Sequence, residues 1–188
     1  MDQPLDRPAV AFDGGRRVAA GALAEVALKV KQLVDKGVRT PLLVFDADTS
    51  ERIDLDVSGS DQDVLRRLVR PRPRGPGRPR LGVIAREVTL LPRHWDWLNE
   101  QPGGASVTLR KLVDHARHAS VESDRVRRAR EATYRFIVAV AGDRPHFEEA
   151  SRALFAGDVE AFSERIARWP ADVRRHALHL LTGDGPDA

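Results

Sequence analysis

The segment "RPRPRGPGRPR" at residues 70–80 constrains the fold of this chain more than any other feature. It holds five arginines, four prolines and two glycines, with no apolar side chain and no acid. Such a segment has nothing to bury, and its prolines keep the backbone extended, so we expect a polyproline-like linker. The chain must therefore build its cores from residues 1–69 and from residues 81–188.

The surplus positive charge of the chain is confined to this linker. The formal net charge is +3, yet residues 1–69 hold 10 Lys/Arg against 12 Asp/Glu, and residues 81–188 hold 16 of each. The protein is thus not a uniformly basic body that would coat nucleic acid. It is predicted to carry one basic ribbon between two nearly neutral parts.

Composition sets the class of protein. Of 188 residues, 41% are hydrophobic and 31% charged, as in soluble globular proteins, and there is no cysteine to form disulfides or thiolate metal sites. The N-terminus lacks the pattern of a signal peptide, and no apolar run approaches the roughly 20 residues that span a bilayer. We expect a cytoplasmic protein without a membrane partner, associated with the nucleoid if it binds DNA.

Residues 1–69 read as a small α+β domain with the order β-β-α-β-β-α. "AVAF" and "RRVAAG" flank a "DGG" turn, and "ALAEVALKVKQLVDKG" has apolar residues at helical spacing, with Gly37 placed as a C-terminal cap. "PLLVFDA" is typical of a buried strand. "RIDLDV" alternates apolar and acidic residues as a half-exposed strand does, and "SDQDVLRRLV" indicates a short helix.

The rest of the chain is predicted to be helical after one strand. "LGVIAREVTL" indicates the strand, and "PRHWDWLNEQ" a helix with Pro92 in its first turn. "PGG" breaks that helix, and a second one restarts with Ser106 as the expected N-cap. We assign residues 81–119 to this strand-helix-helix segment and residues 120–188 to a helical C-terminal region. The fold class is α+β.

A strand, a helix, a glycine turn and a second helix resemble the plan of ribbon-helix-helix DNA-binding proteins. The resemblance spans Arg86 to Arg117. Leu90, Trp95 and Leu98 match the end of the strand and the first helix, and Gly103, Gly104 and Ser106 match the turn and the cap of the second helix. Leu109, Leu112 and Val113 match the core face of the second helix. The resemblance implies a homodimer in which two strands pair antiparallel and four helices interlock. The two-stranded ribbon would enter the major groove.

The strand can present either of two faces to DNA. We prefer the register in which Val88 and Leu90 point to the core, so that Glu87 and Thr89 point outward. The opposite register turns Arg86 outward but also exposes both apolar residues. Glu87 is an unusual groove residue, because a carboxylate repels phosphates although it can accept a hydrogen bond from cytosine.

The linker enters this strand directly and resembles the core of an AT-hook at "GRPR", residues 77–80. Arginines on an extended proline-containing segment fit the narrow minor groove of A/T-rich DNA. The alternative is a solvated spacer. The predicted DNA-contacting residues are Arg74, Arg78 and Arg80 in the linker, Arg86, Glu87 and Thr89 in the strand, and Ala105 and Ser106, whose amides can hold a phosphate at the start of the second helix.

Three longer segments resemble a bacterial family of domains of unknown function, number 2239. They are "PLLVFDADTSERIDLDVSGS", "GRPRLGVIAREVTLLPRHWDWLNEQPGGAS" and "AGDRPHFEEASRALFAGD". This resemblance spans most of the chain and implies no particular activity.

The sequence offers little for catalysis. His115 with His118, and His176 with His179, have helical spacing but lack a nearby carboxylate pattern for a metal. The acidic turn "DADTSE" lacks the glycine and glutamate of a calcium loop, and no Walker or GxSxG motif occurs. We therefore expect no catalytic residue, no metal, no cofactor and no enzymatic activity.

The sequence thus predicts a DNA-binding homodimer, such as a transcriptional regulator or a nucleoid-associated factor. A protein–protein interaction module, antitoxin-like or an adaptor without DNA binding, is the alternative. Trp95 is expected in the core of the first helix, while Trp97 lies elsewhere on that helix and is available to a partner.

Overall fold

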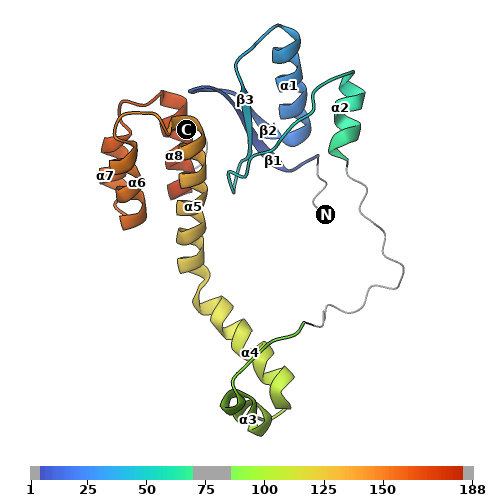
Figure 1. The fold of residues 1–188 in the computed structure, drawn as a ribbon, viewed down its shortest axis with the longest axis vertical. Helices are drawn as coiled ribbons and strands as arrows, with labels where there is room; N and C mark the ends of the chain where they lie inside the picture. Colours follow the sequence, from blue (N-terminus) through green and yellow to red (C-terminus); the bar gives the residue numbers. More distant parts are fainter. Residues whose placement is uncertain (1–4, 70–85, 184–188) are drawn as a thin grey trace. The chain divides into compact units, whose positions relative to one another are not determined.

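The structure is a computed structural model that describes residues 5–69 and 86–183 (Figure 1). The linker at residues 70–80 lies outside the described residues, as does part of the predicted strand. The chain divides into two compact units. One combines residues 1–71 with residues 126–188, and the other comprises residues 72–125. Within the described residues, no helix has the length and apolar character required to cross a membrane.

The first unit is built on a three-stranded antiparallel sheet with the order β2-β1-β3. The strands are β1 (Pro8–Asp13), β2 (Arg16–Ala22) and β3 (Leu42–Asp46). Gly14 has a positive φ of 53° in the turn between β1 and β2, where glycine avoids a Cβ clash. The predicted fourth strand over "RIDLDV" is wrong, because only Arg52 forms a bridge, to Phe45.

One face of the sheet packs against α1 (Leu23–Asp35), with α2 (Asp61–Leu68) beside α1. The buried residues there include Ala9, Ala11, Val26, Val30 and Val44. Helix α1 ends as predicted, since Gly37 follows it with a φ of 88°. Helix α2 begins at a capping box in which Ser60 and Asp63 bond each other's backbone amides.

The other face of the sheet packs against two helices from the C-terminal part of the chain, α5 (Val121–Ala141) and α8 (Ala171–Thr182). Helices α6 (Phe147–Ala156) and α7 (Val159–Arg165) add side chains to the same core. Val10, Phe12 and Phe45 join Phe136 and Ile137 in this larger core. Because side chains alternate along a strand, β1 sends Ala9 and Ala11 to one layer and Val10 and Phe12 to the other.

The second unit contains α3 (Pro92–Glu100), α4 (Gly104–Ala119) and the start of α5. Pro92 occupies the first turn of α3, as predicted. The predicted N-cap is wrong, because α4 begins two residues before Ser106 and Gly103 is its N-cap, with a φ of 91°. Residues 86–91 form no strand in the single chain, and they pair with no other strand in the described part of it.

Candidate nucleic-acid interface

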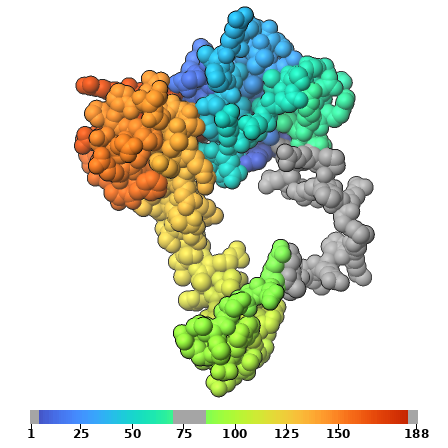
Figure 2. Space-filling model, viewed as in Figure 1, coloured from blue at the N-terminus to red at the C-terminus, as the bar shows by residue number. Residues whose placement is uncertain are grey.

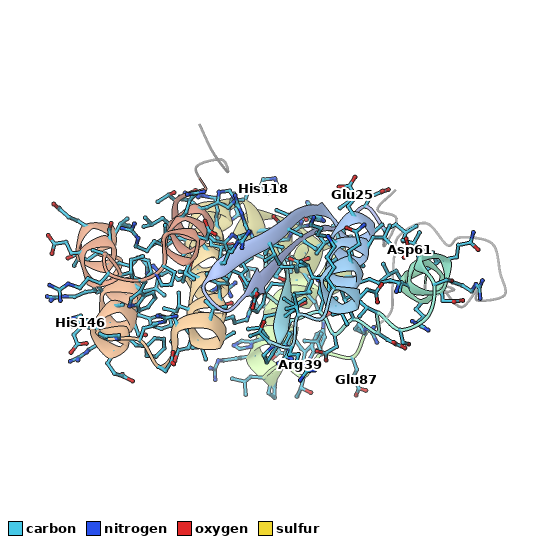
Figure 3. All side chains as sticks on the ribbon, turned by 90° about the horizontal axis from the view of Figure 1, so that it is seen from above. Glu25, Arg39, Asp61, Glu87, His118 and His146 are labelled. Atoms are coloured by element: carbon cyan, nitrogen blue, oxygen red, sulfur yellow. The ribbon has the colours of Figure 1, made fainter. Side chains whose placement is uncertain are left out.

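The segment that leads into α3 presents its side chains to solvent. Arg86, Glu87 and Thr89 are exposed. Figure 3 labels Glu87, whose side chain projects outward from its segment. Leu90 is half-buried, whereas Val88 is 54% exposed. Leu90 therefore faces the helices as the preferred register requires, but Val88 is uncovered. Arg74, Arg78 and Arg80 lie outside the described residues.

The start of α4 offers backbone amides. Its N-cap, Gly103, has no side chain to satisfy them, while the amide of Gly104 donates to the carbonyl of Gln101 at 2.9 Å. Ala105 is half-buried and Ser106 is exposed. First-turn amides have no acceptor within a helix, and they carry the positive end of its dipole. The amides of Ala105 and Ser106 can thus meet an anion here without competition from a capping side chain.

Helices α3 and α4 form an apolar surface that the single chain leaves uncovered. Between them lies a hollow of about 440 Å³, lined mainly by Leu90, Trp97, Leu98, Leu109 and Leu112. Around it, the exposed large apolar side chains of the unit are Val88, Leu91, Trp95, Trp97, Leu112, Val113 and Val121. The prediction that Trp95 is buried is not met in the single chain, where Trp95 is 36% exposed.

Burial in this unit is too slight for an independent core. Leu98, at 3% exposure, is the one buried residue among residues 86–125, and α4 buries none. Ordering each residue costs about 1–2 kcal/mol of conformational entropy, which burial must offset. A helical hairpin that buries one side chain does not meet this cost alone.

The charge on the segment with α3 and α4 is nearly balanced. Residues 86–119 contain five Lys/Arg and four Asp/Glu. Without the linker, the strand-helix-helix segment therefore attracts a phosphate backbone only weakly. Affinity for DNA would have to come from the arginines of residues 70–80 and from helix amides.

The titratable residues singled out in the sequence have structural roles. Asp46 is buried and accepts hydrogen bonds from Arg7 and from the amides of Asp48 and Thr49, at 3.1 and 2.7 Å to the latter two. Burial raises the pKa of Asp46, but the hydrogen bonds from Arg7 and Thr49 together outweigh burial, so the pKa is lowered from its usual value. The carboxylate of Asp46 thus holds the acidic turn after β3 in place. Among the described residues, no cluster of His, Asp and Glu is arranged to hold a metal.

His176 is a core residue that the sequence does not distinguish from the other histidines. Its ring lies among Phe12, Phe136 and His179, with ring centroids 5.5, 4.5 and 6.3 Å away. Burial, helped by His179 and Arg17, lowers its pKa to about 4. The buried imidazole is therefore neutral at physiological pH.

The sequence does not reveal a second hollow, which lies in the first unit between the turn after β3 and α5. It has a volume of about 620 Å³ and is lined by residues around Ser50 and around Arg135. Ser50 has a positive φ of 54°. The sequence does not indicate this conformation, because serine rarely adopts it.

The chain matches the model of a bacterial family over residues 8–181, described as "uncharacterized protein conserved in bacteria", DUF2239. It belongs to this family. No curated protein and no solved structure matches it. The match includes both compact units, so the family is defined by the α+β unit together with the α3–α4 unit.

Proposed function

We propose that this member of the DUF2239 family is a DNA-binding protein that acts as a homodimer of the ribbon-helix-helix type. One observation carries the proposal. Among its described residues, the unit of residues 72–125 has the predicted two helices with a glycine turn between them and buries only Leu98, and the five arginines of residues 70–80 precede these helices in the sequence. A second copy would supply the missing cover.

A second copy also satisfies the backbone of residues 86–90. These residues form no strand hydrogen bonds within the described chain. Antiparallel pairing of two such segments would give each a partner and would turn alternate side chains to one face of the ribbon. On that face, Glu87 and Thr89 would approach base edges, while the amides of Ala105 and Ser106 would hold phosphates.

The linker arginines are expected to provide most of the affinity. Each phosphate neutralised by Lys or Arg releases counterions, so the observed binding constant falls as salt rises. Since residues 86–119 are nearly neutral, this salt dependence must come from residues 70–80.

The test is a gel shift or fluorescence anisotropy titration with a random pool of duplexes, followed by selection of bound sequences. The affinity of the wild-type protein should fall steeply between 50 and 200 mM salt, because contacts between arginines and phosphates weaken over this range. The double variant Arg78→Ala with Arg80→Ala should bind at least about tenfold more weakly, with a shallower salt slope.

The matched control is Arg39→Ala with Arg168→Ala, which removes the same charge from exposed positions outside the proposed interface. It should bind DNA like the wild type. If the wild-type dimer binds no duplex at low salt, DNA binding is excluded.

A protein–protein interaction module is the second candidate. The exposed carboxylate of Glu87 and the balanced charge of residues 86–119 favour it. In that case the protein would still self-associate through α3 and α4, but neither arginine pair would affect DNA retention.

A further inference from the structure

The hollow of about 620 Å³ in the first unit has the layout of a ligand site. It lies within one compact unit, between the turn after β3 and helix α5. In Figure 2 these two segments, teal and orange, lie side by side. Six of its lining residues carry the argument: Phe45, Ser50, Arg52, Tyr134, Arg135 and Val138.

The floor of this pocket is apolar, and it stays accessible. Tyr134 is 36% exposed and Val138, one helical turn further along α5, is 47% exposed. The ring of Tyr134 is held by an edge-on contact with Phe155, whose centroid lies 5.1 Å away. A fixed aromatic face beside an aliphatic side chain suits a flat apolar body.

Arg135 brings a fixed positive charge to the rim. Its guanidinium donates to the carbonyl oxygen of Thr49 at 2.7 Å, a bond that positions the group without neutralising it. Its nearest carboxylate partner, Glu131, is 3.7 Å away and makes a shorter contact of 3.1 Å with Arg127. The charge of Arg135 is therefore only partly compensated.

Arg52 adds a second cation to the lining. Its contact with Asp54 is 3.3 Å long, and both side chains are exposed, so the pair contributes little. Glu51 also lines the pocket, and its exposed contact with Arg7, 3.6 Å long, contributes little for the same reason. With two arginines against one glutamate, the lining favours one negative group rather than a positive one.

Ser50 lines the same pocket and supplies a hydroxyl. Its Oγ is buried and has no hydrogen-bond partner among the described residues. A buried hydroxyl without a partner is costly, and rotation about χ1 would let it donate to an oxygen that enters the pocket.

We infer that this pocket binds a small aromatic carboxylate. The ring lies on Tyr134 and Val138, and the carboxylate meets Arg52, Arg135 and the hydroxyl of Ser50. No bond is made or broken. The inference concerns only the first unit and stands whether or not the protein binds DNA.

The test uses full-length protein labelled with ¹⁵N and titrated with 2-naphthoate, an aromatic carboxylate of suitable size. We expect the amide signals of Ser50, Arg52, Val138 and Ala139 to shift in a saturable manner. The double variant Arg52→Gln with Arg135→Gln should bind at least about tenfold more weakly, because each charge-assisted hydrogen bond is strong. Arg39→Gln with Arg168→Gln is the matched control and should bind normally.

A neutral probe tests the charge requirement. We expect 2-naphthamide, which has the same ring system, to bind at least about tenfold more weakly than 2-naphthoate. Equal binding of the two probes, or shifts confined to the apolar hollow between α3 and α4, would overturn the inference. Because the spectrum of each variant also reports its fold, a variant that fails to fold is recognised, and the comparison of the two probes on wild-type protein still decides.

Discussion

Ser50 combines two unfavourable features in one residue. Its φ of 54° is strained for a side chain with a Cβ, and its buried hydroxyl lacks a partner among the described residues. Its amide nevertheless donates to the carbonyl of Asp46 at 3.0 Å, which fixes the turn. Strain that the surrounding structure holds in place is characteristic of functional sites.

We expect Ser50→Gly to stabilise the protein. Relief of the backbone strain and loss of the buried hydroxyl should outweigh the extra chain entropy of glycine, for a net gain of about 1 kcal/mol. Urea denaturation followed by circular dichroism measures the change. Ser50→Ala is the control, since it removes the hydroxyl but keeps the strain, and it should therefore gain less than the glycine variant. A glycine variant less stable than the alanine variant would contradict this account.

His176 should make the stability of the first unit depend on pH. Its pKa is about 4 in the folded protein and about 6.5 when unfolded, so only the unfolded state gains a proton as pH falls through this window. The stabilisation is complete above pH 6.5 and is lost progressively toward pH 4. Between pH 7.5 and pH 5 the loss should be about 2 kcal/mol.

Urea denaturation at these two pH values tests this effect. His176→Leu, of similar volume, removes the titration, so its stability should change by about 2 kcal/mol less over the same interval. His118→Leu is the control, because His118 is exposed on α4. If wild type and His176→Leu lose the same stability, another group is responsible.

Helices were predictable from this sequence, but the segment after β3 was not. The spacing of apolar residues located α1 and the C-terminal helices correctly, because each buries one face. In "RIDLDV", the alternation of Ile53, Leu55 and Val57 predicted a strand. These side chains do pack against the α1 layer, yet the pairing with β3 stops after the bridge between Arg52 and Phe45 and the bond from the Ile53 amide to the Val44 carbonyl. Alternation reports one-sided burial of an extended chain, and hydrogen-bond pairing is a separate condition.

The candidate sites also differ in how far the sequence predicted them. The glycine turn and the two helices of the α3–α4 unit were readable from local residues, since turn and cap chemistry acts over a few positions. The pocket around Ser50 was not, because the bond between Thr49 and Arg135 joins residues 86 positions apart. Apolar residues left uncovered on α3 and α4 also look the same in sequence as buried ones.

At the level of the α3–α4 element, a charge on the apolar surface should prevent self-association. Val113 is 54% exposed in the single chain and would be covered in the proposed dimer. Val113→Glu would bury a carboxylate there, so we expect a dimeric wild type and a monomeric or strongly dissociating variant. Light scattering coupled to gel filtration measures the mass. Val34→Glu, at an exposed apolar position on α1, is the matched control and should remain dimeric. A monomeric wild type would exclude the dimer.

At the scale of the whole molecule, the two units should unfold differently. The first unit has two buried clusters of its own, whereas the α3–α4 unit buries only Leu98 among its described residues and would gain its core in the proposed dimer. Unfolding coupled to dissociation occurs at a temperature that rises with protein concentration. We expect this dependence for the α3–α4 unit and not for the first.

Tryptophan fluorescence can separate the two transitions. Trp95 and Trp97 lie on α3, while Trp169 is buried in the first unit, where its indole donates to the carbonyl of Pro145 at 2.9 Å. In a Trp169→Phe variant, emission reports α3 alone, and its midpoint should rise over a hundredfold concentration range. Far-ultraviolet circular dichroism should show a second transition at a fixed temperature. Coincident, concentration-independent transitions would contradict the expected difference.

The central strand β1 is covered on one side by α1 and on the other by helices that begin more than a hundred residues later. During synthesis, the ribosome therefore releases β1 long before the segments that shield Val10 and Phe12 emerge. Until then, Val10, Phe12 and Phe45 lack the helices that bury them in the folded chain. The α3–α4 unit lies between the two halves of this core in the sequence, so it emerges from the ribosome before the core can close.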